Sequence, residues 1–190
     1  MKCSLALLLT ASLLAGCVSA PLAPMPGRQS VRDFSLDGRF ALRATRPDQP
    51  AQSAGGRLAW THKNQTDHIL LANPLGYGLA EIETCPQISR LRLADGKTSQ
   101  STDPDSLIEE VTGQRLPVAR LPAWLLGRSG GRAQIEHDPL GRPLRLLEDG
   151  WQIDYMYDND APDALPDRLN LSNGNGLELR LRIEEWKDIP

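Results

Sequence analysis

Apolar and polar residues alternate along most of the chain, in short segments separated by turn-forming residues. The clearest segment is 177–183, Leu-Glu-Leu-Arg-Leu-Arg-Ile, in which every second side chain is apolar. A period of two is typical of an antiparallel strand with one buried and one solvated face. The same period occurs in residues 34–37, 39–43, 57–60, 68–71, 79–82, 88–93, 144–147 and 151–155. These segments predict a mainly β fold of about ten antiparallel strands that follow one another as a meander.

Residues 103–113 interrupt the alternation and predict a short helix. Asp103 fits the N-cap, Pro104 the first helical position, and Gly113 the residue after the helix end. The apolar residues of its predicted buried face are Leu107, Ile108 and Val111.

Residues 116–127 predict one or two further helical turns, because two prolines each suit the start of a turn and Gly127 suits the end. Their apolar residues are Leu116, Leu121, Trp124 and Leu125. An apolar helical face of this kind needs a partner surface, and the open side of the sheet offers one. The pattern as a whole predicts a curved antiparallel sheet with a helical lid, an α+β arrangement dominated by strands.

The first sixteen residues have the features of a secretory signal: Lys2, then an apolar core, then small residues. The apolar run ends well before the roughly 20 residues that a transmembrane helix needs. Residues 14–17, Leu-Ala-Gly-Cys, match the bacterial lipoprotein box at all four positions. That resemblance implies a lipid on the sulfur of Cys17 and cleavage just before it. Val18 stands where an aspartate would mark retention in the inner membrane, which favours a lipid anchor in the outer membrane.

The chain therefore divides into a signal peptide (1–16), a lipidated N-terminus with a proline-rich tether (17–30) and one domain (31–190). Without the signal peptide, 20 lysines and arginines face 24 aspartates and glutamates. This balance is not basic enough for a nucleic-acid-binding protein.

Several residues of types that are often catalytic or metal-binding lack the neighbouring residues that those roles require. His62, His68 and His137 do not have metal-ligand spacing, and Cys85 has no second cysteine left to pair with. Ser129 lies in a formal G-x-S-x-G match, but the hydrolase elbow needs a strand before the serine and a helix after it. Here a helix is expected before it and a strand after it. We expect no enzyme activity, no metal and no cofactor beyond the covalent lipid on Cys17; a hydrolase using Ser129 is a remote alternative.

Six segments together resemble the LolB family of outer-membrane lipoprotein receptors. They occur in the family's order, follow a lipoprotein box and cover nearly the whole mature chain. The segments are 37–40, 56–60, 73–76, 107–127, 150–155 and 177–186. The resemblance implies a half-barrel of about eleven strands, closed by helices around an apolar cavity.

The resemblance also implies a function. A LolB-like protein would accept cargo lipoproteins from a LolA-like periplasmic carrier, bind their acyl chains and insert them into the outer-membrane lipid; we expect a monomer. The predicted cavity residues are Leu58, Trp60, Ile69, Leu71, Leu79, Ile82, Trp124, Leu125, Trp151 and Ile153. The same residues could fill an ordinary core, because a half-barrel and a filled sandwich show the same period. The alternative function is then a structural or accessory lipoprotein of an envelope assembly.

Leu75 is the predicted membrane-insertion residue. It lies between Pro74 and Gly76, which favour a tight loop and keep the leucine out of a strand ladder. In the family, this leucine stands on a protruding loop and is implicated in placing cargo into the membrane. The opposite possibility is a leucine folded back onto the sheet.

Three arginines, Arg39, Arg43 and Arg57, lie in the predicted strands. They could line the cavity mouth and attract an acidic carrier, or occupy the solvent face. The sequence leaves these two possibilities open.

Overall fold

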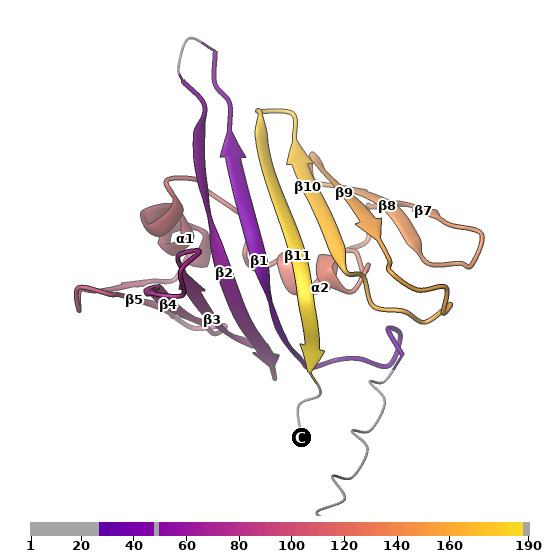
Figure 1. Ribbon diagram of the computed structural model, residues 1–190, viewed down its shortest axis with the longest axis horizontal. Coiled ribbons are helices and arrows are strands. Elements are labelled where there is room, and N and C mark those ends of the chain that lie inside the picture. Colours follow the sequence, from indigo (N-terminus) through magenta and orange to yellow (C-terminus); the bar gives the residue numbers. More distant parts are fainter. Residues whose placement is uncertain (1–26, 48–49, 188–190) are drawn as a thin grey trace, which may run out of the picture.

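The computed structural model describes residues 27–47 and 50–187, which form one antiparallel sheet of eleven strands and two short helices (Figure 1). The predicted signal peptide and Cys17 lie outside the described residues. The strands are β1 (Phe34–Ala44), β2 (Gln52–Lys63), β3 (Thr66–Ala72), β4 (Gly78–Thr84), β5 (Ser89–Leu93), β6 (Thr98–Ser101), β7 (Gln134–His137), β8 (Pro143–Glu148), β9 (Trp151–Met156), β10 (Arg168–Asn173) and β11 (Leu177–Lys187). The predicted mainly β fold is confirmed.

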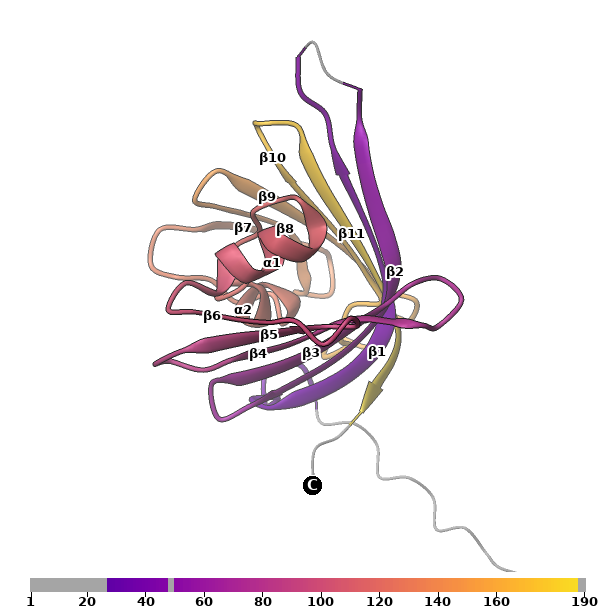
Figure 2. The same ribbon diagram turned by 90° about the vertical axis from the view of Figure 1, so that its left-hand side faces the viewer.

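The strands follow the order β6-β5-β4-β3-β2-β1-β11-β10-β9-β8-β7. The first and last strands of the chain, β1 and β11, therefore pair in the middle of the sheet, while β6 and β7 form its two edges. The chain passes from one edge to the other through α1 (Pro104–Thr112) and α2 (Leu121–Leu125). Figure 2 shows the sheet curving around both helices, which lie on its concave side. The predicted half-barrel with a helical lid is confirmed, and the sheet remains open.

The alternation in sequence sets which side chains face the helices. In β11, Leu177, Leu179, Leu181 and Ile183 are buried, while the residues between them are exposed. The register between β1 and β11 shifts at Gly38. A Cβ atom there would lie 2.4 Å from the backbone oxygen of Arg182, so this close strand contact requires glycine.

The caps of α1 are those predicted. A side-chain oxygen of Asp103 accepts a hydrogen bond from the backbone N–H of Asp105 at 3.1 Å. Gly113 adopts a left-handed conformation (φ 71°) and its N–H donates to the backbone oxygen of Glu109 at 2.8 Å. Within the described part of the chain, no helix is long and apolar enough to cross a bilayer.

A buried carboxylate, that of Glu148 on β8, fixes α2 to the sheet. It accepts hydrogen bonds from the indole N–H of Trp124 at 2.6 Å, the backbone N–H of Gly130 at 2.7 Å and the guanidinium of Arg120 at 3.0 Å. The hydroxyl of Tyr155 donates to the backbone oxygen of Trp124 at 2.8 Å. Burial raises the pKa of Tyr155, so its phenol stays protonated and remains a donor. The lid is therefore anchored at α2 by several buried polar contacts.

The described residues just before β1 contact the end of the lid. Arg28 is buried and donates to the backbone oxygen of Leu126 at 3.4 Å. From the other direction, the guanidinium of Arg128 donates to the backbone oxygens of Arg28 and Val31 at 3.1 and 2.5 Å. The segment just before β1 is thus held against the end of the lid.

The contacts of Glu148 predict the cost of losing its carboxylate. Glu148→Ala leaves the indole of Trp124 and the N–H of Gly130 without partners inside the protein, and should destabilise the fold by about 3 kcal/mol. Glu136→Ala removes an exposed carboxylate on neighbouring β7 and should cost less than about 0.5 kcal/mol. Urea unfolding followed by tryptophan fluorescence measures both. Equal midpoints for the two variants would contradict the anchoring role of Glu148.

Candidate functional site

The concave face of the sheet and the helices enclose one apolar core. Nine of the ten predicted cavity residues pack there, eight of them buried and Trp151 partly buried beside Trp124, with ring centroids 6.0 Å apart. These nine are Leu58, Trp60, Ile69, Leu71, Ile82, Trp124, Leu125, Trp151 and Ile153. Sequence alternation thus brought together side chains from β2, β3, β4, β9 and α2.

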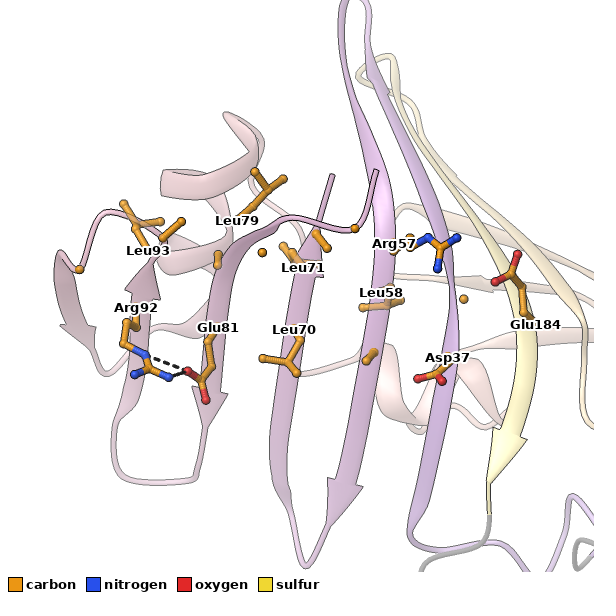
Figure 3. A pocket seen from close by; sticks show the side chains of 18 residues that line it. Asp37, Arg57, Leu58, Leu70, Leu71, Leu79, Glu81, Arg92, Leu93 and Glu184 are labelled. Carbon is orange, nitrogen blue, oxygen red and sulfur yellow. Dashed lines mark hydrogen bonds and ion pairs between the residues drawn. The ribbon is translucent and has the colours of Figure 1, made fainter. Parts of the chain in front are cut away.

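The inward placement predicted for Leu79 is wrong. In β4, Ala80, Ile82 and Thr84 face the core, so by the period of two Leu79 lies on the convex face, where it is 40% exposed. Leu79 lines a groove of about 720 Å³ on the outside of the sheet, as does Leu70 (Figure 3). On the same side of this groove, the Nε of Arg92 donates to a carboxylate oxygen of Glu81 at 2.8 Å.

The space left inside the core is small, and all its lining residues except Thr112 are apolar. It measures about 50 Å³ and lies between the inner face of the sheet and the segment that contains α1, room for only one or two water molecules. The lid contributes Ile108, Leu116, Val118 and Leu121, and the sheet contributes Leu58, Trp60 and Leu71 among others. An acyl chain therefore enters only if the lid moves away from the sheet.

The lid is attached unequally at its two ends. Within the described residues, the α1 end has no buried carboxylate among its contacts with the sheet. The amide of Gln114, a buried residue, donates to Gln52 on β2, and the hydroxyl of Ser106 donates to that of Ser101 on β6, both at 3.0 Å. The bond from Ser99 on β6 to Glu110, also 3.0 Å, is exposed. Within the lid, Asp105 accepts from the backbone N–H of Val118 at 2.9 Å, which joins α1 to the loop that follows it. Burial raises the pKa of this aspartate. The arrangement favours movement of α1 and its loop as one unit.

The loop between β3 and β4 projects from the convex side of the sheet (Figure 2). The side-chain oxygen of Asn73 accepts from the backbone N–H groups of Leu75 and Tyr77 at 2.9 and 3.1 Å, and Gly76 adopts φ 93°. This self-contained turn leaves Leu75 83% exposed and Tyr77 70% exposed. Leu75, between Pro74 and Gly76, points into solvent as predicted and does not fold back onto the sheet.

The structure settles the position of Arg39, Arg43 and Arg57. All three alternate with inward residues of β1 and β2 and lie on the convex, solvent-facing side, not inside the concave core. The nearest acidic partner of Arg39 is Glu184, with 2.6 Å between Nε and Oε1.

The remaining chemical candidates have local structural partners. His62 contacts the buried carboxylate of Asp67 at 2.7 Å, and His68 contacts Glu81 at 2.7 Å. The thiol of Cys85 donates to the backbone oxygen of Ile88. Ser129 follows α2 and precedes β7, the reverse of the order that a hydrolase elbow needs. Across residues 27–47 and 50–187, no cluster of three or more metal-binding side chains occurs.

Residues 32–186, almost the whole described fold, match the family model "Outer membrane lipoprotein LolB". The chain belongs to the LolB family. One LolB relative, from Dechloromonas aromatica (strain RCB), is 68% identical over 190 residues and covers all of both chains. A second, from Bordetella petrii, is 37% identical over 158 residues, 81% of this chain and 78% of the relative. Both are named outer-membrane lipoprotein LolB.

A solved structure shows the same fold at low sequence identity. It is a LolA superfamily protein from Nitrosomonas europaea, matched with a TM-score of 0.51 and 12% identity, over 87% of this chain and 96% of that one. This LolB chain therefore shares its overall fold with that protein.

The unequal lid attachment predicts that fixing α1 to the sheet blocks entry of an apolar chain. In an unacylated Cys85→Ala background, Gln52→Cys/Gln114→Cys places two thiols where the amides now meet. A short, reducible cross-linker should slow uptake of a fluorescent long-chain fatty acid on the order of tenfold, and reduction should restore it.

A matched control bridges two strands and leaves the lid free. The hydroxyls of Ser35 and Thr61 lie 3.1 Å apart across β1 and β2. Cross-linked Ser35→Cys/Thr61→Cys should take up the fatty acid at the normal rate. Unchanged uptake in the bridged lid variant would show that the chain enters without movement of α1.

Proposed function

We propose that this chain is an outer-membrane receptor that holds the acyl chains of lipoproteins between its sheet and its helical lid and passes them to the membrane. The observation that carries the proposal is its membership of the LolB family, with a full-length relative that is 68% identical. The apolar core under the helical lid supplies a physical route. No catalytic residue enters this mechanism.

The chemistry of the cargo explains why a receptor is needed. Burying a methylene group is worth about 0.8 kcal/mol, so one sixteen-carbon chain resists exposure to water by on the order of 12 kcal/mol. Release of such a chain into the periplasm would be extremely slow. The chain must pass directly from the apolar interior of a carrier to that of the receptor.

The partner at this step is a LolA-like carrier, and the cargo is a lipoprotein. Transfer runs forward if the receptor binds the acyl chains more tightly than the carrier does, without any nucleotide. In the receptor, each chain takes over apolar contacts that α1 makes with the sheet in the closed form. Opening the lid gives up the burial of its own apolar side chains. This loss offsets part of the free energy of acyl-chain binding, so the cargo can be released.

A single receptor molecule, anchored by a lipid on Cys17, is sufficient for this mechanism. The predicted tether, within residues 17–30, follows that cysteine in the sequence. The anchor raises the concentration of the receptor at its target bilayer and takes no part in accepting the chains.

Leu75 supports the delivery step. An exposed leucine on a projecting loop gains energy by entering the interfacial region of a bilayer, since it loses contact with water there. Tyr77, two residues later and also exposed, suits the same region, where an aromatic body is buried and a hydroxyl stays wet. The loop thus brings the receptor into contact with the lipid that receives the cargo.

Replacing Leu75 tests the delivery step. Unacylated mature Leu75→Glu should accept a labelled lipoprotein from a loaded carrier normally, because Leu75 lies outside the core. It should then release the label into vesicles at about one-tenth of the normal rate or more slowly, because a buried glutamate is costly at the interface. Scintillation counting of the vesicle fraction measures the release.

Leu144→Glu is the matched control, since Leu144 is another exposed leucine on β8 and should not affect either step. Normal delivery by Leu75→Glu would refute the role of the loop. Failure of the unaltered chain to take the label would refute the receptor function and favour an accessory lipoprotein with a filled core.

A further inference from the structure

Four arginines form a row across the convex face of the sheet. In the strand register, Arg57 of β2 lies opposite Arg39 of β1, Arg39 lies opposite Arg182 of β11, and Arg182 lies opposite Arg168 of β10. Directly opposite residues share one face and have Cβ atoms about 5 Å apart. We refer to Arg57, Arg39, Arg182 and Arg168 as the arginine row.

The protein neutralises only half of this row. Arg39 pairs with Glu184 at 2.6 Å and Arg168 pairs with Asp158 at 2.7 Å. Within the described residues, Arg57 and Arg182 have no ion-pair partner. Like charges placed directly opposite each other destabilise a sheet. The row is thus a concentration of positive charge in a chain whose formal net charge is −3.

The row borders a groove that is open to an external anion. The groove measures about 520 Å³, and its lining also includes Arg180, whose guanidinium lies 3.4 Å from a carboxylate oxygen of Glu178. Its floor includes Ala41, Gly55 and Gly56, whose small or absent side chains leave the guanidinium groups uncovered. Arginine suits phosphate in particular, because its planar fork can donate two hydrogen bonds to one phosphate group.

The projecting loop identifies the kind of anion. Pro74 lines the same groove as the arginine row, and the exposed side chains of Leu75 and Tyr77 follow it in the chain. Figure 2 shows this loop on the convex side of the sheet, away from the helices. A basic patch beside an exposed apolar tip is the combination that binds the surface of an anionic membrane.

We propose that the arginine row binds the phosphate groups of anionic membrane lipids and so holds the Leu75 loop against the bilayer. The proposal deepens the proposed function, since it assigns the surface by which the receptor meets its target membrane. Binding through the convex face leaves the lid, on the concave face, free to receive cargo. Lipid contact and cargo entry then use opposite faces of one sheet.

The test uses the unacylated mature chain from residue 18, because the described fold begins at Gly27 and contains its own core. Sedimentation with phosphatidylcholine vesicles, with and without phosphatidylglycerol, measures binding without carrier or cargo. The unaltered chain should prefer the anionic vesicles, and added salt should weaken that binding. Equal binding to both kinds of vesicle would overturn the proposal.

Two charge-matched variants locate the binding surface. Arg57→Gln/Arg182→Gln should bind anionic vesicles about thirtyfold more weakly. Arg90→Gln/Arg132→Gln removes two exposed charges elsewhere and should stay within about threefold of the unaltered chain. Equal weakening in both variants would show a general charge effect and overturn the proposal.

Two further measurements show whether the substitutions disturb folding, and whether the row binds an acidic carrier protein instead of lipid. Because the row is self-repulsive, Arg57→Gln/Arg182→Gln should unfold at the same urea concentration as the unaltered chain or a higher one. Arg57→Lys/Arg182→Lys keeps both charges and should retain vesicle binding to within about fivefold. If the glutamine variant binds vesicles normally but no longer accepts cargo from the carrier, the row is a carrier-binding surface and the lipid proposal is wrong. Vesicle binding involves no cargo, so its outcome is independent of the receptor test.

Discussion

The apolar concave face of an open sheet must be covered, and the rest of the structure depends on this constraint. Large apolar side chains each gain about 1.5–3 kcal/mol from burial, and a half-barrel with free edges at β6 and β7 cannot bury them against itself. The segment between these edges supplies the cover, as α1 and α2. Acyl chains offer the sheet a chemically equivalent cover. Exchange of one apolar cover for another is therefore the simplest way for this fold to bind lipid.

The polar contacts decide which part of the cover can be exchanged. Breaking the bonds of buried Glu148 to Trp124 would leave unpaired groups in an apolar interior, which is costly. At the α1 end, the bond between Ser99 and Glu110 is exposed, so water can replace it, and the bond from buried Gln114 to Gln52 involves two uncharged amides. The small apolar space lies under the α1 end. Position and energetics thus both favour opening at α1, with α2 as the fixed end.

Sequence alternation predicted the strands well because a period of two directly reflects burial on one face. It failed at Leu79, since Leu79 and Ile82 cannot share a face and small Ala80 took the inward position. The Leu75 loop was predictable from Pro74 and Gly76. The closed interior was not, because filled and hollow half-barrels have the same pattern. The arginine row was also hidden: its members span residues 39–182, and only the strand register aligns them.

The convex face bears charge that the fold does not need. A sheet can satisfy its solvent face with alternating charges, as Arg92 and Glu81 do on β5 and β4. In the central strands, arginine faces arginine instead, at the cost of some stability. Such a pattern is consistent with selection for an external anion, since binding one at Arg57 and Arg182 recovers energy that the internal ion pairs of Arg39 and Arg168 do not. The nearby Leu75 loop makes a membrane surface the ligand that satisfies both the charge and the exposed apolar tip at once.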